Sequence, residues 1–250
     1  MVSVMSVVRR FFLREPDPEA IIVSHEGVDY SVALRRMPQA RRFTLRVRAA
    51  TRDAILTMPA RSRVSDAVSF AERHGGWIAT RLDRIPEALA FLPGTVVPLR
   101  GVPHSVQHRP DRRGTVWVEN GAILVAGEAD FLSRRVQDFL KREARKDLEA
   151  ATRRYADRLG VKVTRIGIRD QSSRWGSASS TGAINYSWRL ILAPPFVLDY
   201  LAAHEVAHLR EMNHSARFWR IVRELCPSLE PAKAWLRVNG ANLHRYGSGE

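Results

Sequence analysis

The residues that most constrain the fold lie between positions 200 and 219, in the stretch YLAAHEVAHLREMNHSARFW. His204 and His208 are four residues apart, so in a helix both rings project from one face, one turn apart. Two imidazoles placed in this way can bind one divalent ion. Glu205 lies about 100° around the helix from His204, beside the ion, where its carboxylate can take a proton from a metal-bound water. The stretch therefore predicts a helix that carries a metal site.

His214 indicates where this helix ends. Six residues beyond His208, a continuing helix would have rotated by about 240° and would point the ring away from the site. Asn213 favours an earlier end, because asparagine accepts the left-handed conformation that ends many helices. Ser215 can then cap the next helix. On this interpretation the chain turns back and His214 becomes the third ligand, while Glu224 is the alternative ligand that the sequence offers.

Three neutral imidazoles with an open fourth position suit zinc, so we expect one Zn²⁺ per chain. Because the metal lowers the pKa of its bound water, Glu205 is the expected general base and hydrolysis the expected reaction class. The competing interpretation is chance, since His-Glu-Xaa-Xaa-His arises in roughly one sequence of this composition in a hundred. Chance would also have to supply the helix, the third histidine and the turn before it.

The remaining sequence predicts an α+β fold. Residues 28–127 contain short β-type runs separated by turn residues, with Asn120-Gly121 a strong hairpin signal and one helical excursion at residues 62–85. From Asp130 apolar residues recur at helical spacing, and Gly160 is well placed to end that helix. We expect an N-terminal extension, a β-rich lobe and a metallohydrolase domain that carries the histidine helix, over residues 1–27, 28–129 and 130–250 respectively.

The net charge of +14 is compatible with nucleic-acid binding, because a basic face collects phosphates. Only four of the 40 basic residues are lysines, so a bias toward arginine codons would produce much of this surplus without any partner. The charge is nevertheless concentrated, since residues 34–63 hold nine arginines against Asp53 alone. Residues 43–48 alternate apolar and polar, which places Arg46 and Arg48 on the solvent face of a strand. If the protein has a polyanion surface, the sequence places it in this stretch, with Arg46 and Arg48 as its candidate contacts.

The single cysteine, Cys226, cannot form an internal disulfide, which fits a reducing cytoplasm. The apolar N-terminal run is cut short by Arg9 and Arg10, and no small-residue cleavage site follows. No window reaches the roughly 18 apolar residues that a membrane helix requires. We expect a cytoplasmic protein without a membrane partner, and the sequence leaves its oligomeric state open.

Four stretches together resemble the YgjP-like metallopeptidases, relatives of the SprT-like zinc proteases: RRFTLRVR, SSRWGSASSTGAINYSWRLILAPP, HEVAHLREMNHSARFW and AWLRVNGANL. The resemblance covers residues 29–246. It implies a zincin-like α+β domain with His204, His208 and His214 as metal ligands and Glu205 as the catalytic glutamate.

Two family comparisons limit this assignment. The family's loop usually has a cysteine where Ala178 follows Ser177, which leaves the four core residues in place. Metzincin proteases share the histidine spacing, but Glu211 stands where they have glycine, and no methionine follows His214 to form their Met-turn.

The loop SSRWGSAS has two interpretations. In the first, Arg174, Trp175 and Ser177 line the cleft and contact substrate or the developing oxyanion. In the second, Trp175 packs under the metal-binding helix and Gly176 makes a turn.

The leading hypothesis is a zinc-dependent peptidase that cleaves peptide bonds with a zinc-bound water activated by Glu205. One alternative is a metal-dependent nucleotide phosphohydrolase, since the same nucleophile can attack phosphorus and an arginine surplus favours an anionic substrate. Another is a non-enzymatic module that binds nucleic acid through Arg46 and Arg48 and keeps zinc for stability. A peptidase acting on DNA-bound proteins, as the SprT-like relatives suggest, would combine the first and the last.

Overall fold

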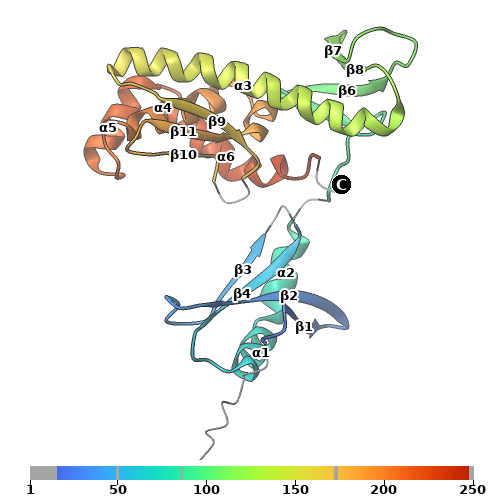
Figure 1. The fold of residues 1–250 in the computed structure, drawn as a ribbon, viewed down its shortest axis with the longest axis vertical. Coiled ribbons are helices and arrows are strands. Elements are labelled where there is room, and N and C mark those ends of the chain that lie inside the picture. Colours follow the sequence, from blue (N-terminus) through green and yellow to red (C-terminus); the bar gives the residue numbers. More distant parts are fainter. Residues whose placement is uncertain (1–15, 49–50, 86, 172–173, 248–250) are drawn as a thin grey trace, which may run out of the picture. The chain divides into compact units, whose positions relative to one another are not determined.

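The computed structural model describes residues 16–48, 51–85, 87–171 and 174–247, and it confirms the expected α+β class (Figure 1). The chain divides into two compact units. The first comprises the residues up to Arg48 together with Asp53–Leu82, and the second comprises Ala49–Arg52 and Asp83–Glu250. None of the described helices combines the length and the apolar character needed to cross a bilayer.

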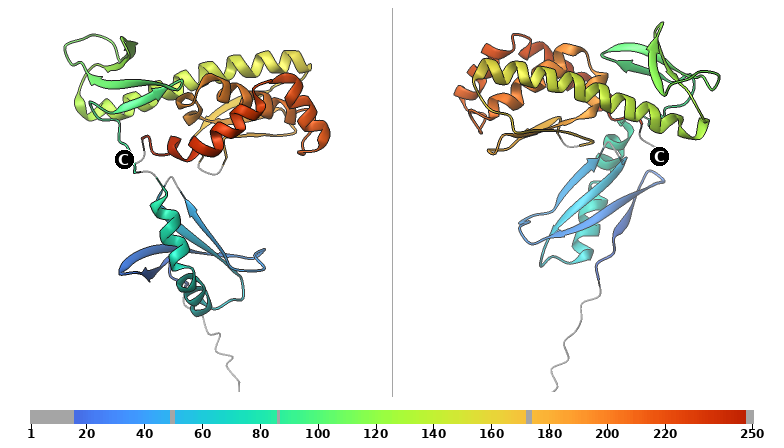
Figure 2. Two further views of the ribbon diagram at one scale, coloured as in Figure 1. Left: turned by 180° about the vertical axis from the view of Figure 1, so that it is seen from behind. Right: turned by 45° about the horizontal axis from the view of Figure 1, so that its top comes forward.

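The first unit is a four-stranded sheet with helices on one face (Figure 2). Its elements are β1 (Ala20–His25), β2 (Val28–Met37), β3 (Thr44–Arg48), β4 (Asp53–Pro59), α1 (Val64–Arg73) and α2 (Gly75–Asp83). The strand order is β1-β2-β4-β3, with β2 parallel to β4 and the outer pairs antiparallel. The predicted helical excursion forms two helices, which are divided at His74, immediately before Gly75-Gly76.

The second unit begins with another four-stranded sheet, which contains β5 (Val96–Leu99), β6 (Val102–His108), β7 (Val116–Glu119) and β8 (Ala122–Val125) in the order β5-β6-β8-β7. The antiparallel strands β7 and β8 meet at Asn120 and Gly121, whose φ angles are 48° and 72°. These left-handed values are those of a type I′ turn, which confirms the predicted hairpin. A short 3₁₀ turn, η1 (Ala129–Phe131), follows.

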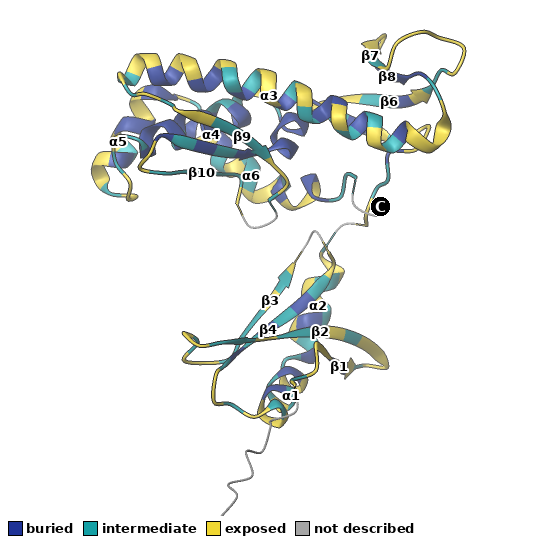
Figure 3. Ribbon diagram, in the orientation of Figure 1, coloured by how far each residue is buried: buried dark blue, intermediate teal, exposed yellow. Residues whose placement is uncertain are grey.

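The remainder of the second unit surrounds a three-stranded sheet. Its elements are α3 (Leu132–Leu159), β9 (Arg165–Arg169), β10 (Gly176–Ala178), β11 (Ala183–Ser187), η2 (Trp188–Leu192), α4 (Pro195–His208), α5 (Ala216–Leu225) and α6 (Leu229–Leu243). Gly160 ends α3 in the left-handed conformation, with φ 65°. The sheet order is β10-β11-β9, so β10 lies at an edge, antiparallel to β11. Helices α3 and α4 and the turn η2 form the large core with this sheet (Figure 3).

The division of the chain differs from the expected one. Strand β1 lies within residues 1–27, where an extension was expected, and residues 1–15 lie outside the described part of the chain. The strands expected in a single lobe over residues 28–129 form two separate sheets, one in each unit. The physical reason is that the two apolar sheet faces are covered by different helices: α1 and α2 close the first core, whereas α3 completes the second.

Candidate metal centre

Helix α4 begins at a proline pair and ends at the second histidine of the motif. Pro195 occupies its first turn, where the missing N–H has no helical partner to lose. The last turn tightens beyond His208, since the N–H of Leu209 donates to Val206 O. The helix therefore ends before His214, as its spacing from His208 predicts.

The turn that follows is built differently from the expected one. Asn213 is not among the described residues with positive φ, so the predicted left-handed conformation is wrong. Its side-chain Oδ1 instead accepts a hydrogen bond from the N–H of Ser215 at 3.0 Å. The Ser215 hydroxyl accepts from the N–H of Phe218 at 3.2 Å and caps α5, which confirms the predicted cap. An asparagine can turn the chain through its side-chain acceptor as well as through its backbone.

This turn brings three histidines together. One ring nitrogen of each of His204, His208 and His214 lies within 4.8 Å of the others. The Nε2 atoms of His204 and His214 are 3.2 Å apart. Zinc–nitrogen bonds of about 2.0–2.1 Å in a tetrahedron separate two nitrogens by roughly 3.3–3.4 Å. Glu224, the alternative ligand, is exposed on α5 and is not part of this cluster.

Contacts behind the rings orient two of the histidines. The Nδ1 of His208 lies 3.2 Å from the carbonyl oxygen of Glu211, and the Nδ1 of His204 lies 3.5 Å from the Tyr200 hydroxyl. A ring that donates from Nδ1 presents the lone pair of Nε2 to a metal. These contacts at the two Nδ1 atoms therefore favour the tautomers that a metal requires.

Aromatic rings pack around the cluster. Phe218, which is fully buried, stacks on His208 with ring centroids 4.4 Å apart, and Trp219 stacks on His214 at 5.6 Å. The Nζ atom of Lys233 lies 5.1 Å from the Trp219 ring centroid. These rings exclude water from one side of the histidines, which strengthens electrostatic interactions there.

Burial also sets the protonation of the histidines. It lowers the pKa of His204 to about 3, with smaller contributions from His208 and His214. It lowers the pKa of His208 as well. Both imidazoles are therefore neutral near pH 7, which is the form that binds metal ions.

Glu205 is buried against strand β10. Only 4% of its surface is exposed, and burial raises the pKa of its carboxyl group to about 8, while Arg174 acts in the opposite direction. A Cβ atom added to Gly176 would lie 2.7 Å from both Cγ and Cδ of Glu205, and closer still to Oε1. The carboxyl group therefore rests directly on the backbone of Gly176.

Arg174, Trp175 and Ser177 lie in three different environments. Arg174 is exposed and interacts electrostatically with Glu205. Trp175 stacks on His244 with centroids 4.9 Å apart and packs against Gly240, so these contacts are with α6 and its C-terminal cap, whereas the packing interpretation placed Trp175 under α4. Ser177 follows Gly176 in an extended strand, and its side chain therefore points to the sheet face opposite Glu205.

Comparison with known proteins identifies the family of this chain. The family model described as YgjP-like, metallopeptidase domain matches residues 41–239. The chain belongs to the YgjP-like family. The resemblance drawn from the four sequence stretches is confirmed, and with it the expectation of a metal-dependent hydrolase of the peptidase class.

One solved structure similar to this YgjP-like chain is the metallopeptidase zymogen of Pyrococcus abyssi abylysin. The two are 26% identical, with a TM-score of 0.34, over 40% of this chain and 97% of the other. No curated protein matches the chain.

Residues that sequence reasoning missed also contribute to this YgjP-like site. The sequence predicts Gly176 only as a turn residue, whereas the structure places it in strand β10, and no sequence pattern assigns a role to Tyr200 or Lys233. The spacing of Tyr200, four residues before His204 on the same helix, was a usable signal. The positions of Gly176 and Lys233 depend on how β10 and α6 pack against α4, which no local pattern shows.

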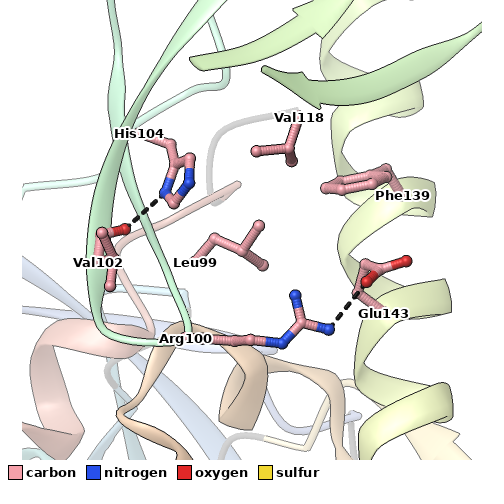
Figure 4. Close-up of a pocket in the computed structure, with 7 residues that line it drawn as sticks. All are labelled: Leu99, Arg100, Val102, His104, Val118, Phe139 and Glu143. Carbon is pink, nitrogen blue, oxygen red and sulfur yellow. Dashed lines mark hydrogen bonds and ion pairs between the residues drawn. The ribbon is translucent and has the colours of Figure 1, made fainter. Parts of the chain in front are cut away.

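A cavity of about 500 Å³ lies elsewhere in the second unit (Figure 4). Its walls come from β5, β6, β7 and α3, and it shares no lining residue with the histidine cluster. Its cationic side chain is already paired, since Arg100 bonds to Asp147 at 2.7 Å and to Glu143 at 2.8 Å. The metal centre is therefore distinct from this cavity.

The buried carboxyl group makes the stability of the metal-free protein depend on pH. The pKa of Glu205 rises from 4.5 to about 8 on folding, so the folded state holds a proton that the unfolded state releases above pH 4.5. That of His204 falls from 6.5 to about 3, which has the opposite effect below pH 6.5. Between pH 4.5 and 6.5 the two groups change the free energy of unfolding in opposite directions. Above pH 6.5 only Glu205, of these two, makes it depend on pH.

We therefore expect the free energy of unfolding of the metal-free protein to fall between pH 6.5 and 8 by up to about 1.4 kcal/mol per pH unit from this carboxyl group. Glu205→Gln should remove that decline, because glutamine remains neutral. Urea unfolding of both proteins after chelation, at pH 6.5 and 8, measures the difference. Equal declines in the two proteins would show that Glu205 is ionised when buried.

Proposed function

We propose that this chain is a zinc-dependent metallopeptidase in which three histidines hold one zinc ion and Glu205 is the general base. The observation that carries the proposal is the 3.2 Å separation of the Nε2 atoms of His204 and His214, beside a buried carboxyl group. His208 completes a donor set of three imidazoles, which suits zinc and leaves one position open.

Zinc bound there would act as a Lewis acid that lowers the pKa of a water molecule and polarises the scissile carbonyl group. Glu205 would take a proton from the attacking water and pass it to the nitrogen of the leaving amine. Burial raises the pKa of this carboxyl group in the metal-free protein, whereas the positive charge of a bound zinc ion would lower it and favour the ionised form that accepts a proton.

The edge strand β10 supports a peptide substrate. Among the described strands it pairs only with β11, and it lies against α4, the helix that carries Glu205. An unpaired strand edge can bind an extended peptide through main-chain hydrogen bonds. Gly176 adds no side chain at the point where β10 meets Glu205. A peptide aligned on this edge would therefore lie beside the carboxyl group.

The nucleotide phosphohydrolase proposed from the sequence would use the same general base. Family membership favours the peptidase, because the matching domain is described as a metallopeptidase domain. Assays with peptides and with nucleoside triphosphates, each in the wild type and in Glu205→Gln, separate the two activities.

The metal content of the purified protein tests the ligand set. We expect near one zinc per chain, and we expect His214→Ala to weaken zinc binding by roughly 100-fold or more, because one of three protein ligands is lost. His104→Ala is the matched control: its Nδ1 contacts only the carbonyl oxygen of Val102 among the described hydrogen bonds, outside the cluster. Wild-type protein that binds no zinc after zinc is supplied would refute the proposal.

A further inference from the structure

The sheet of the first unit has one covered and one open face. Val32, Ala54 and Leu56 are fully buried in the core formed with α1 and α2. Their neighbours in each strand point to the opposite face, because side chains alternate along a strand. Arg35 pairs in register with Thr57, and Arg46 with Ile55, so both arginines are on that open face. Both are exposed.

Positive charge gathers at one end of the open face. Arg35 lies near the end of β2 and Arg46 at the middle of the five-residue strand β3, and the exposed connection between these strands contains Arg41 and Arg42 (Figure 3). We call these four residues the basic end. Strand β4 lies between β2 and β3, and its residue Thr57, which pairs in register with Arg35, has a hydroxyl group that can also bind a phosphate.

The acidic residues of this face lie at its other end and have partners. Asp53 accepts a hydrogen bond from Arg48 Nε at 2.7 Å, and Asp29 accepts one from the Ser24 hydroxyl at 2.5 Å. The two arginines expected to bind polyanions therefore differ: the charge of Arg48 is matched by Asp53, whereas Arg46 belongs to the basic end.

The opposite side of the unit has a different charge balance. Helices α1 and α2 contain two arginines, Arg73 and Arg81, and three acidic residues, Asp66, Glu72 and Asp83. A general bias toward arginine codons would add arginines to both sides alike. The concentration at one end of the sheet therefore needs another explanation, and charge complementarity to a polyanion supplies one.

We propose that the open face, through its basic end, binds the phosphate backbone of double-stranded nucleic acid. Sheets that bind single strands stack bases on aromatic side chains. The open-face positions of the four described strands hold arginine, aspartate, hydroxyl, aliphatic and methionine residues and no aromatic ring. Arg35 and Arg46 are two strands apart across the sheet and two residues apart along the strand direction. Their Cα atoms are therefore separated by about 12 Å, which is close to the width of a major groove.

The test is fluorescence anisotropy with a 20-base-pair DNA duplex of mixed sequence at several salt concentrations. We expect the logarithm of the affinity to fall linearly with that of the salt concentration. Arg35→Glu/Arg46→Glu should reduce the slope by about 2 and the affinity by at least about tenfold. The matched control, Arg73→Glu/Arg81→Glu, makes the same charge change on the helical side and should bind within about twofold of the wild type.

Three results would overturn the proposal: wild-type binding that does not depend on salt, equal losses in the two variants, or tighter binding of a single strand of the same length. Circular dichroism establishes that both variants fold. The basic end shares no residue with the metal centre, so hydrolysis of a short peptide by the Arg35→Glu/Arg46→Glu variant should equal that of the wild type. The two proposals can therefore fail independently.

Discussion

Glu205→Gln is expected to lower kcat for peptide hydrolysis by about 10³-fold while the zinc content stays at the wild-type level. Glutamine keeps the shape of the side chain and cannot take a proton from the attacking water. The substituted side chain is not one of the three clustered imidazoles, so the ligand set is intact. A fluorogenic peptide assay under saturating substrate, run beside elemental analysis, measures both quantities on one preparation.

Glu224→Gln is the matched control for this substitution. Glu224 is exposed on α5 and was the alternative ligand in the sequence, so its replacement should change neither the zinc content nor kcat. Turnover retained in Glu205→Gln would place the general base elsewhere. Nucleotide hydrolysis that persists in Glu205→Gln would show that it does not depend on the base proposed here.

The histidine cluster was predictable because its constraints are local. The spacing of His204 and His208 requires a helix, and the position of His214 requires that helix to end. The means of turning was not predictable, because Asn213 can end a helix either with a left-handed backbone or with its side-chain acceptor. The same sequence is compatible with both arrangements, and only the folded structure distinguishes them.

Features that depend on strand pairing were predicted less well. The alternation of apolar and polar residues in 43–48 correctly predicted that Arg46 and Arg48 point away from the core. This prediction needs only the two-residue period of a strand and no knowledge of its partners. The bond between Arg48 and Asp53 depends on the register of β3 against β4, which alternation does not define. The division of the strands between two sheets likewise depends on which helices cover them, and those contacts are between residues far apart in the sequence.

The contact between Gly176 and Glu205 links two segments almost thirty residues apart in the sequence. Nothing in the loop sequence shows that β10 passes over this side of α4. A glycine in an edge strand ordinarily weakens it, because it has no side chain to pack. Here the missing Cβ provides the space that the carboxyl group of Glu205, the proposed general base, occupies.

Gly176→Ala is therefore expected to lower kcat/KM for peptide hydrolysis by about 100-fold without loss of zinc. The added methyl group would lie 2.7 Å from Cγ and Cδ of Glu205, a separation that atoms do not tolerate. The carboxyl group, at the end of a flexible side chain, would move before the paired strand does. A displacement of about 1 Å in a reacting group is enough to cost a factor of this size.

Ser177→Ala is the control for Gly176→Ala, because it changes the adjacent residue of the same strand on the opposite face. We expect its kcat/KM to stay within about threefold of the wild type, because the half-buried Ser177 side chain points to the sheet face opposite Glu205. Zinc content and thermal unfolding, measured on both variants, separate displacement of Glu205 from a general loss of structure. Full activity in Gly176→Ala would mean that the carboxyl group works from another position, and the arrangement of Glu205 against β10 would then have no part in catalysis.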